Sequence, residues 1–114
     1  MTDDLRAMIA SHDGVFTTHQ AHSHGVSADG IRHRVRTGQW VRVTRGAFRV
    51  ADRTVDDRMR MRLAVLQTGP GAALAGAAAA WWHGLVSRVP DVPVVVAPHG
   101  RHGTRVEDAT VWHR

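Results

Sequence analysis

The chain has no cysteine, no lysine and no tyrosine among its 114 residues. The lack of cysteine excludes disulfides, thiolate metal sites and thiol catalysis. No apolar run approaches the roughly 20 residues that cross a bilayer, since the longest extends only from 72 to 82. The first residues are acidic and contain no apolar signal segment. We therefore expect a soluble, cytoplasmic protein with no membrane partner.

Positive charge is concentrated in one segment. All 15 basic residues are arginine, and with ten acids the net charge is +5. Residues 31–50 contain six of these arginines and no acid, so the positive charge of this segment exceeds the net charge of the whole chain. Such density is typical of a surface that binds a polyanion, and phosphate is the default candidate. Double-stranded DNA is the partner that we expect.

The spacing of apolar residues predicts different elements in succession along the first half of the chain. Val15 and Phe16 are expected only as an apolar pair, with Thr17 capping the helix that follows. Three short helices followed by a hairpin are the pattern of a winged helix-turn-helix, in which the third helix enters the major groove and the hairpin lies on the DNA backbone. The predicted elements are helices over 3–12, 18–23 and 27–36, then strands over 40–43 and 47–50 joined by a turn at 44–46.

The second half predicts a smaller mixed region. Its expected elements are helices over 55–68 and 72–83 and strands over 94–97 and 110–112. The fold class is therefore α+β: a winged helix-turn-helix DNA-binding domain over 1–51, then a small α/β region over 52–114. An unpaired final strand is an aggregation liability, which favours a homodimer or a longer chain.

The third helix and the hairpin carry the candidate DNA-binding residues. Gly30 is unusual inside such a helix, and it either allows close approach of the backbone to DNA or is simply tolerated. The alternative for this whole segment is a solvated basic face that binds nothing. We assign the major groove to Ser27, Asp29, Arg32, His33 and Arg36, a flanking phosphate to Arg34, and wing contacts to Arg42, Thr44, Arg45 and Arg49.

These segments resemble a known family. The resemblance is carried by Gly14-Val15-Phe16-Thr17, by Gly25-Val26-Ser27 and by residues 31–48, which read IRHRVRTGQWVRVTRGAF. Together they are similar to the N-terminal winged helix-turn-helix of AbiEi-family antitoxins, and the similarity continues more weakly to about residue 98. The resemblance implies a DNA-binding antitoxin of a type IV toxin–antitoxin system that represses its own operon through inverted repeats, with a cognate toxin as a protein partner. It also implies that residues 52–114 begin a longer antitoxin C-terminal domain.

Two other function classes receive less support. A nuclease needs paired carboxylates around a metal, and the candidates Asp56-Asp57 and Glu107-Asp108 lie beside arginines or near the end of the chain, with no lysine anywhere. The loop from Gly100 to Gly103 also lacks the lysine of a phosphate-binding loop. We predict that the protein is not an enzyme and needs no cofactor.

Histidines and tryptophans leave two alternatives open. His19, His22 and His24 are spaced so that two could hold one ion, but no carboxylate or cysteine completes the set, and His99 and His102 are similarly isolated. We assign no metal site, and a histidine-based metal-responsive regulator is the weaker alternative. Trp81 and Trp82 are expected mainly in the core. Apolar surface exposed around them or on the final strand would instead favour a protein-interaction module that binds a toxin or a C-terminal domain.

Overall fold

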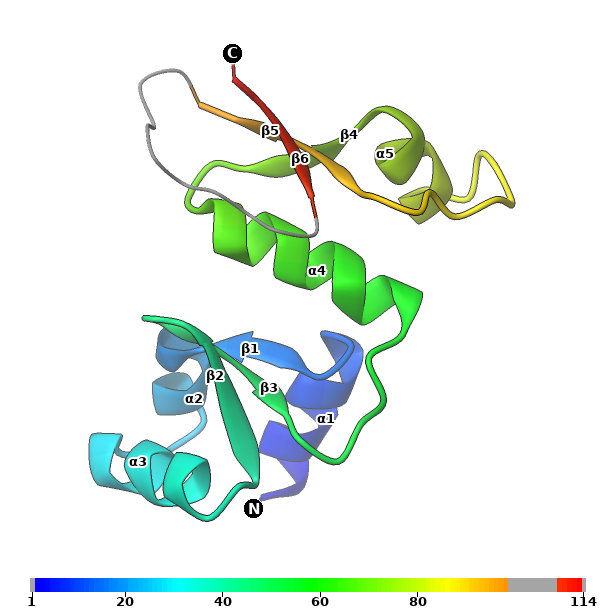
Figure 1. The fold of residues 1–114 in the computed structure, drawn as a ribbon. Coiled ribbons are helices and arrows are strands. Elements are labelled where there is room, and N and C mark those ends of the chain that lie inside the picture. Colours follow the sequence, from blue (N-terminus) through cyan, green and yellow to red (C-terminus); the bar gives the residue numbers. More distant parts are fainter. Residues whose placement is uncertain (1, 99–108, 114) are drawn as a thin grey trace. The chain divides into compact units, whose positions relative to one another are not determined.

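The computed structural model describes residues 2–98 and 109–113. The chain divides into two compact units, Met1–Met59 and Arg60–Arg114, each with helices and a three-stranded sheet. The fold class is therefore the predicted mixture of α and β elements (Figure 1). The first compact unit extends eight residues past position 51, where the sequence places the end of the DNA-binding domain.

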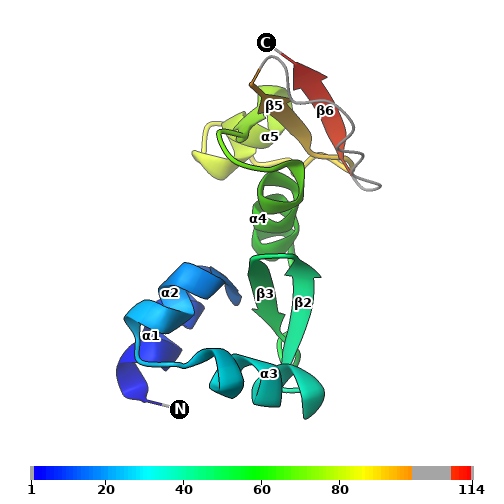
Figure 2. The same ribbon diagram turned by 90° about the vertical axis from the view of Figure 1, so that its left-hand side faces the viewer.

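The first unit contains three helices and an antiparallel sheet of strand order β1-β3-β2. Figure 2 shows β2 leaving the end of α3 and pairing with β3 as a hairpin. This arrangement is the predicted winged helix-turn-helix. Its elements are α1 (Asp3–Ser11), β1 (Val15–Thr17), α2 (Thr18–Ser23), α3 (Ala28–Arg36), β2 (Trp40–Thr44) and β3 (Ala47–Val50).

Side-chain caps fix where these helices begin. The Thr17 hydroxyl accepts a hydrogen bond from the Gln20 N–H, and the Gln20 side chain accepts one from the Thr17 N–H, which completes a capping box. The Ser27 hydroxyl accepts from the Gly30 N–H at 3.0 Å and caps α3. Between α2 and α3, Gly25 has a φ of 85°, a left-handed conformation that glycine adopts without strain. The predicted starts of α2 and α3 are confirmed.

Strand β1 was not predicted as a strand. Its three residues pair antiparallel with β3, and Phe16 lies opposite Phe48. A segment this short shows no alternation of its own, so it adopts strand geometry because the edge of the hairpin is available for pairing.

Aromatic side chains form the centre of the first unit's core. The Phe16 and Trp40 rings pack edge to face with centroids 4.6 Å apart, and Phe16 stacks on Phe48 at 5.8 Å. Phe16, Trp40 and Phe48 come from β1, β2 and β3, and Ile31 of α3 belongs to the same buried cluster, so the core joins the third helix to the sheet. The buried cluster consists of Leu5, Ile9, Phe16, Ala21, Val26, Ile31, Trp40 and Phe48.

The boundary between the units falls inside α4, and the rest of that helix begins the second unit. In the second sheet, β4 pairs antiparallel with β5, and β6 pairs parallel with β5. No helix in residues 2–98 or 109–113 is long and apolar enough to cross a membrane. The elements are α4 (Asp57–Thr68), β4 (Ala73–Ala75), α5 (Gly76–Trp82), β5 (Val94–Ala97) and β6 (Thr110–His113).

The helix predicted over 72–83 is wrong in its first part. Ala73–Ala75 is strand β4, and the helix begins only at Gly76. Alanine has a strong helix propensity, but Gly71 and Gly76 have φ values of 79° and 56°, which interrupt a right-handed helix. Pairing with β5 then satisfies the backbone of Ala73, Leu74 and Ala75.

Candidate nucleic-acid interface

Helix α3 has a buried face and a polar exposed face. Ile31 is buried in the core, and Val35 packs against the core from one turn further on. Positions one and two residues after Ile31 point away from it because successive residues turn by about 100° along a helix. The exposed residues on this second face include the predicted groove readers Asp29, Arg32, His33 and Arg36.

Asp29 and Arg32 form an ion pair on this exposed face. The two side chains are 88% and 64% exposed, so the pair is surrounded by solvent. Asp29 is the only acid between residues 14 and 51. It also lies in the first turn of α3, where a negative charge interacts favourably with the helix dipole.

Arg34 differs from its arginine neighbours. It is half-buried, its guanidinium carbon lies 5.2 Å from the centroid of the Trp40 ring, and its Nη1 is 3.4 Å from the Gly30 carbonyl oxygen. These contacts hold Arg34 against the core side of α3, so the stem of this side chain is packed against the protein.

Gly30 lies on the same side of the helix as Arg34. A Cβ atom at position 30 would lie 3.2 Å from a Val26 methyl group and 3.3 Å from both the Arg34 guanidinium and the Ser27 hydroxyl. The glycine therefore leaves room for the helix cap and for Arg34. Neither explanation offered from the sequence, approach to DNA or simple tolerance, describes this packing role.

In the wing, Arg42 orders the turn. Its Nη1 donates a hydrogen bond to the Arg45 carbonyl oxygen at 2.9 Å, and its guanidinium carbon lies 4.9 Å from the centroid of the buried Phe48 ring. The pairing of β2 with β3 is irregular between Arg42 and Thr44, close to the turn. The side-chain hydrogen bond of Arg42 therefore supplements the strand pairing there. Arg42 therefore ties the tip of the wing to its base.

The remaining wing residues differ in exposure. Arg45 is exposed, and within residues 2–98 and 109–113 its guanidinium has no hydrogen-bond or ion-pair partner. Arg49 is half-buried and donates to the Val50 carbonyl oxygen at 3.3 Å, and Thr44 is half-buried as well. Arg45 is thus the wing arginine that is freest to meet a ligand.

Two of the clustered histidines hydrogen-bond to the backbone around α2. His22 Nδ1 lies 2.7 Å from the Val26 carbonyl oxygen, and His24 Nδ1 lies 2.9 Å from that of Gln20. The described part of the chain contains no group of three or more His, Cys, Asp or Glu side chains that could hold a metal ion. His99 and His102 lie outside the described residues.

Asp56, one of the candidate carboxylates of a nuclease, is engaged in contacts within the protein. Asp56 accepts a hydrogen bond from the Met59 N–H at 2.8 Å and pairs with Arg53 at 3.0 Å. The Met59 N–H first, and then Arg53, hold the pKa of Asp56 below its ordinary value. Asp56 therefore caps the start of α4. Glu107, Asp108 and the Gly100–Gly103 loop lie outside the described residues.

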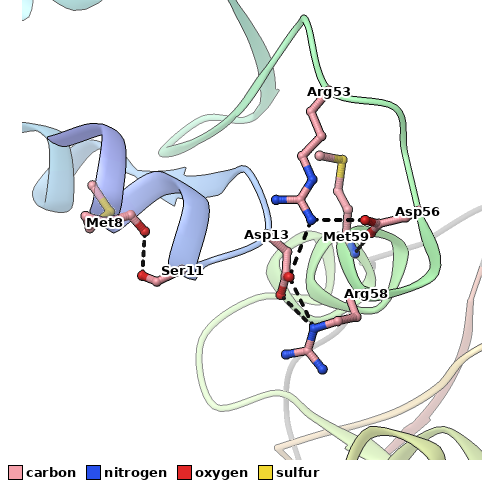
Figure 3. Close-up of polar contacts among 7 residues, drawn as sticks. All are labelled: Met8, Ser11, Asp13, Arg53, Asp56, Arg58 and Met59. Atoms are coloured by element: carbon pink, nitrogen blue, oxygen red, sulfur yellow. Dashed lines mark hydrogen bonds and ion pairs between the residues drawn. The ribbon is translucent and has the colours of Figure 1, made fainter. Parts of the chain in front are cut away.

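Sequence reasoning missed the role of Asp13. This residue has a φ of 56°, and its carboxylate is nearly buried between Arg58, whose Nε lies 3.1 and 3.2 Å from the two oxygens, and Arg53 at 3.6 Å (Figure 3). Because Arg53 also pairs with Asp56, the two acids and two arginines form one network that joins the end of α1 to the start of α4. The sequence predicted only that a helix over 3–12 ends just before this residue. The only hint in the sequence was the residue type, because aspartate adopts the left-handed conformation more readily than most non-glycine residues.

The fold and this basic surface are typical of a winged helix-turn-helix DNA-binding domain. Residues 3–51 match the family model described as transcriptional regulator, AbiEi antitoxin. This part of the chain is therefore similar to AbiEi antitoxin regulators, as the sequence resemblance predicted, and the matched family is one of transcriptional regulators. A search of curated proteins gave no match to the chain.

Proposed function

We propose that this protein is an antitoxin that represses transcription of its own toxin–antitoxin operon. The observation that carries the proposal is the exposed arginine-rich face of α3 beside the arginine-rich wing, in a domain matched to antitoxin regulators. A helix of this kind reads base edges in the major groove while the wing contacts the backbone. Such a repressor acts in the cytoplasm, where its operator is.

The proposed contacts fall into two groups. Arg32, His33 and Arg36 are exposed on α3 and would reach base edges, and Arg45 would neutralise a phosphate. Four other predicted contacts, Ser27, Arg34, Arg42 and Arg49, are engaged with the protein's own backbone or rings, so their main contribution is to position the first group. Thr44 would add a weaker contact at the edge of the wing.

A transcriptional reporter tests the proposal. The promoter upstream of the gene is fused to a reporter, and the wild-type chain is supplied from a second plasmid. We expect repression by the wild type and its loss in Arg36→Ala. Arg88→Ala is the matched control, since Arg88 is an exposed arginine of the second unit and its loss changes the net charge equally. An unrepressed promoter with the wild type, at verified protein levels, would refute autoregulation.

We also propose that the second unit binds the cognate toxin. Leu85 is 79% exposed, Val92 is 49% exposed and Val86 is 45% exposed, and they lie in the segment that joins α5 to β5. Exposed apolar side chains close in sequence favour a protein partner. Trp81 and Trp82 are half-buried, in keeping with a packing role. Co-purification of the toxin should be lost in Leu85→Ser and retained in Arg45→Ala, and equal retention in both would contradict this assignment.

Inverted repeats would require two copies of the domain on one operator. We therefore propose that the DNA-bound form is a homodimer. Sedimentation of the protein with a duplex that contains both half-sites should give two chains per duplex. A single chain at saturation would contradict the dimer.

A further inference from the structure

Asp29 is an acid in the first turn of α3, within a segment whose other charged residues are all arginines. It is 88% exposed, forms an ion pair with Arg32, and has no other acid within the stretch from residue 14 to residue 51. A carboxylate near DNA phosphates weakens the electrostatic attraction between the protein and the DNA backbone, whatever the base sequence. Its position on the reading face of α3 therefore requires an explanation beyond charge.

The hydrogen-bonding chemistry of Asp29 and Arg32 supplies such an explanation. An ionised carboxylate only accepts hydrogen bonds, whereas a guanidinium only donates them. In the major groove, cytosine and adenine present an amino donor, and guanine presents two acceptors at O6 and N7. Phosphate oxygens are acceptors, so they can bind Arg32 but never Asp29.

We propose that Asp29 is a specificity-determining residue that penalises binding to DNA other than the operator. The inference rests on the proposed DNA-binding function. On the operator, the Asp29 carboxylate accepts a hydrogen bond from a base amino group while Arg32 donates to a nearby guanine. On other sequences the same carboxylate faces acceptors and loses its water without gaining a partner, which weakens the complex.

The role of Asp29 at the helix start does not by itself account for this arrangement. A negative charge in the first turn is also provided by Asp4 in α1, which is exposed as well and is paired with no arginine among the described residues. Asp4 and Asp29 thus share the charge and the place in a helix, and only Asp29 lies on the reading face. They form a matched pair for an experiment.

The experiment compares Asp29→Asn with Asp4→Asn in the full chain. Fluorescence anisotropy measures the Kd for the duplex upstream of the gene and for a random-sequence duplex of equal length. For Asp29→Asn we expect tighter binding to the random duplex and a loss of about tenfold in the ratio of the two affinities, the usual effect of one misread base pair. For Asp4→Asn we expect small, equal changes on both duplexes.

Two outcomes would overturn the proposal. If Asp29→Asn shifts both affinities by the same factor, as Asp4→Asn does, then Asp29 is only a charge at the helix start. If it weakens both, with circular dichroism showing an intact fold, then Asp29 contributes to binding in general and not to discrimination. Failure of the proposed function itself is recognised separately, because the wild type would then bind neither duplex.

Discussion

The wing offers a quantitative test of the difference between contacting and positioning arginines. Arg45 is exposed and its guanidinium has no partner in the part of the chain that the structure describes, whereas Arg42 donates to the Arg45 carbonyl oxygen and lies over the Phe48 ring. If Arg42 acts on DNA through Arg45, its removal should matter only while Arg45 is present. The perturbation is a double-mutant cycle with Arg42→Ala, Arg45→Ala and both together.

The expected magnitudes follow from counterion release. Each phosphate contact contributes about 0.9 to the slope of log affinity against log salt. One contact therefore makes binding about eightfold tighter at 0.1 M salt than at 1 M salt. Arg45→Ala should therefore weaken binding about eightfold at 0.1 M. Arg42→Ala removes one hydrogen bond and one cation–π contact, each contributing about 1 kcal/mol or less, and should weaken binding about three- to fivefold through a less ordered tip.

The double variant decides the matter. We expect a loss of about eightfold, the same as for Arg45→Ala alone, measured by anisotropy on a random-sequence duplex over a salt series. A loss of about 24- to 40-fold, the product of the two single effects, would show that Arg42 contacts phosphate independently. Arg42→Lys is the control, because it keeps the charge and loses the geometry; wild-type affinity in that variant would also refute the positioning role.

Three further predictions concern stability, each measured by urea unfolding of the full chain. Asp13→Asn should lower the free energy of unfolding by about 1–2 kcal/mol, since it weakens hydrogen bonds to half-exposed arginines, and an unchanged midpoint would contradict a structural role for the network. Phe16→Ala should cost about 3–5 kcal/mol, because it empties the aromatic core, and a loss below 1 kcal/mol would contradict that packing. Because the folded-state pKa of Asp56 is lowered below its ordinary value of 3.8, its contribution is complete above that pH and is lost as the pH falls through the folded pKa. Asp56→Asn should remove this part of the acid dependence, and an identical acid transition would refute it.

The elements that could be predicted from the sequence are those with local causes. The starts of α2 and α3 are determined by the Thr17 and Ser27 caps within three residues of each helix. Strands β1 and β4 have only three residues each, and their conformation depends on pairing with distant strands. Composition favours a helix in the alanines of β4, and tertiary pairing overrides that preference.

The candidate site shows the same limit. Sequence alone identified the basic segment and assigned Arg34 to a flanking phosphate, yet it could not show that this side chain packs against the protein itself. The position of the Trp40 ring, which holds Arg34 against the core, becomes visible only in the folded structure. The bond between Asp13 and Arg58 spans 45 positions in sequence, so no local pattern could have predicted it.

The central claim is that α3 and the wing bind DNA and recognise a sequence. The most direct measurement is fluorescence anisotropy with the duplex upstream of the gene and with a scrambled duplex, each over a salt series. The account predicts a clear preference for the first duplex and an affinity that falls as salt rises, with a slope of about 0.9 in log affinity against log salt for each phosphate that is neutralised. Equal affinity for both duplexes would contradict sequence recognition, and no binding at low salt would contradict the DNA-binding function altogether.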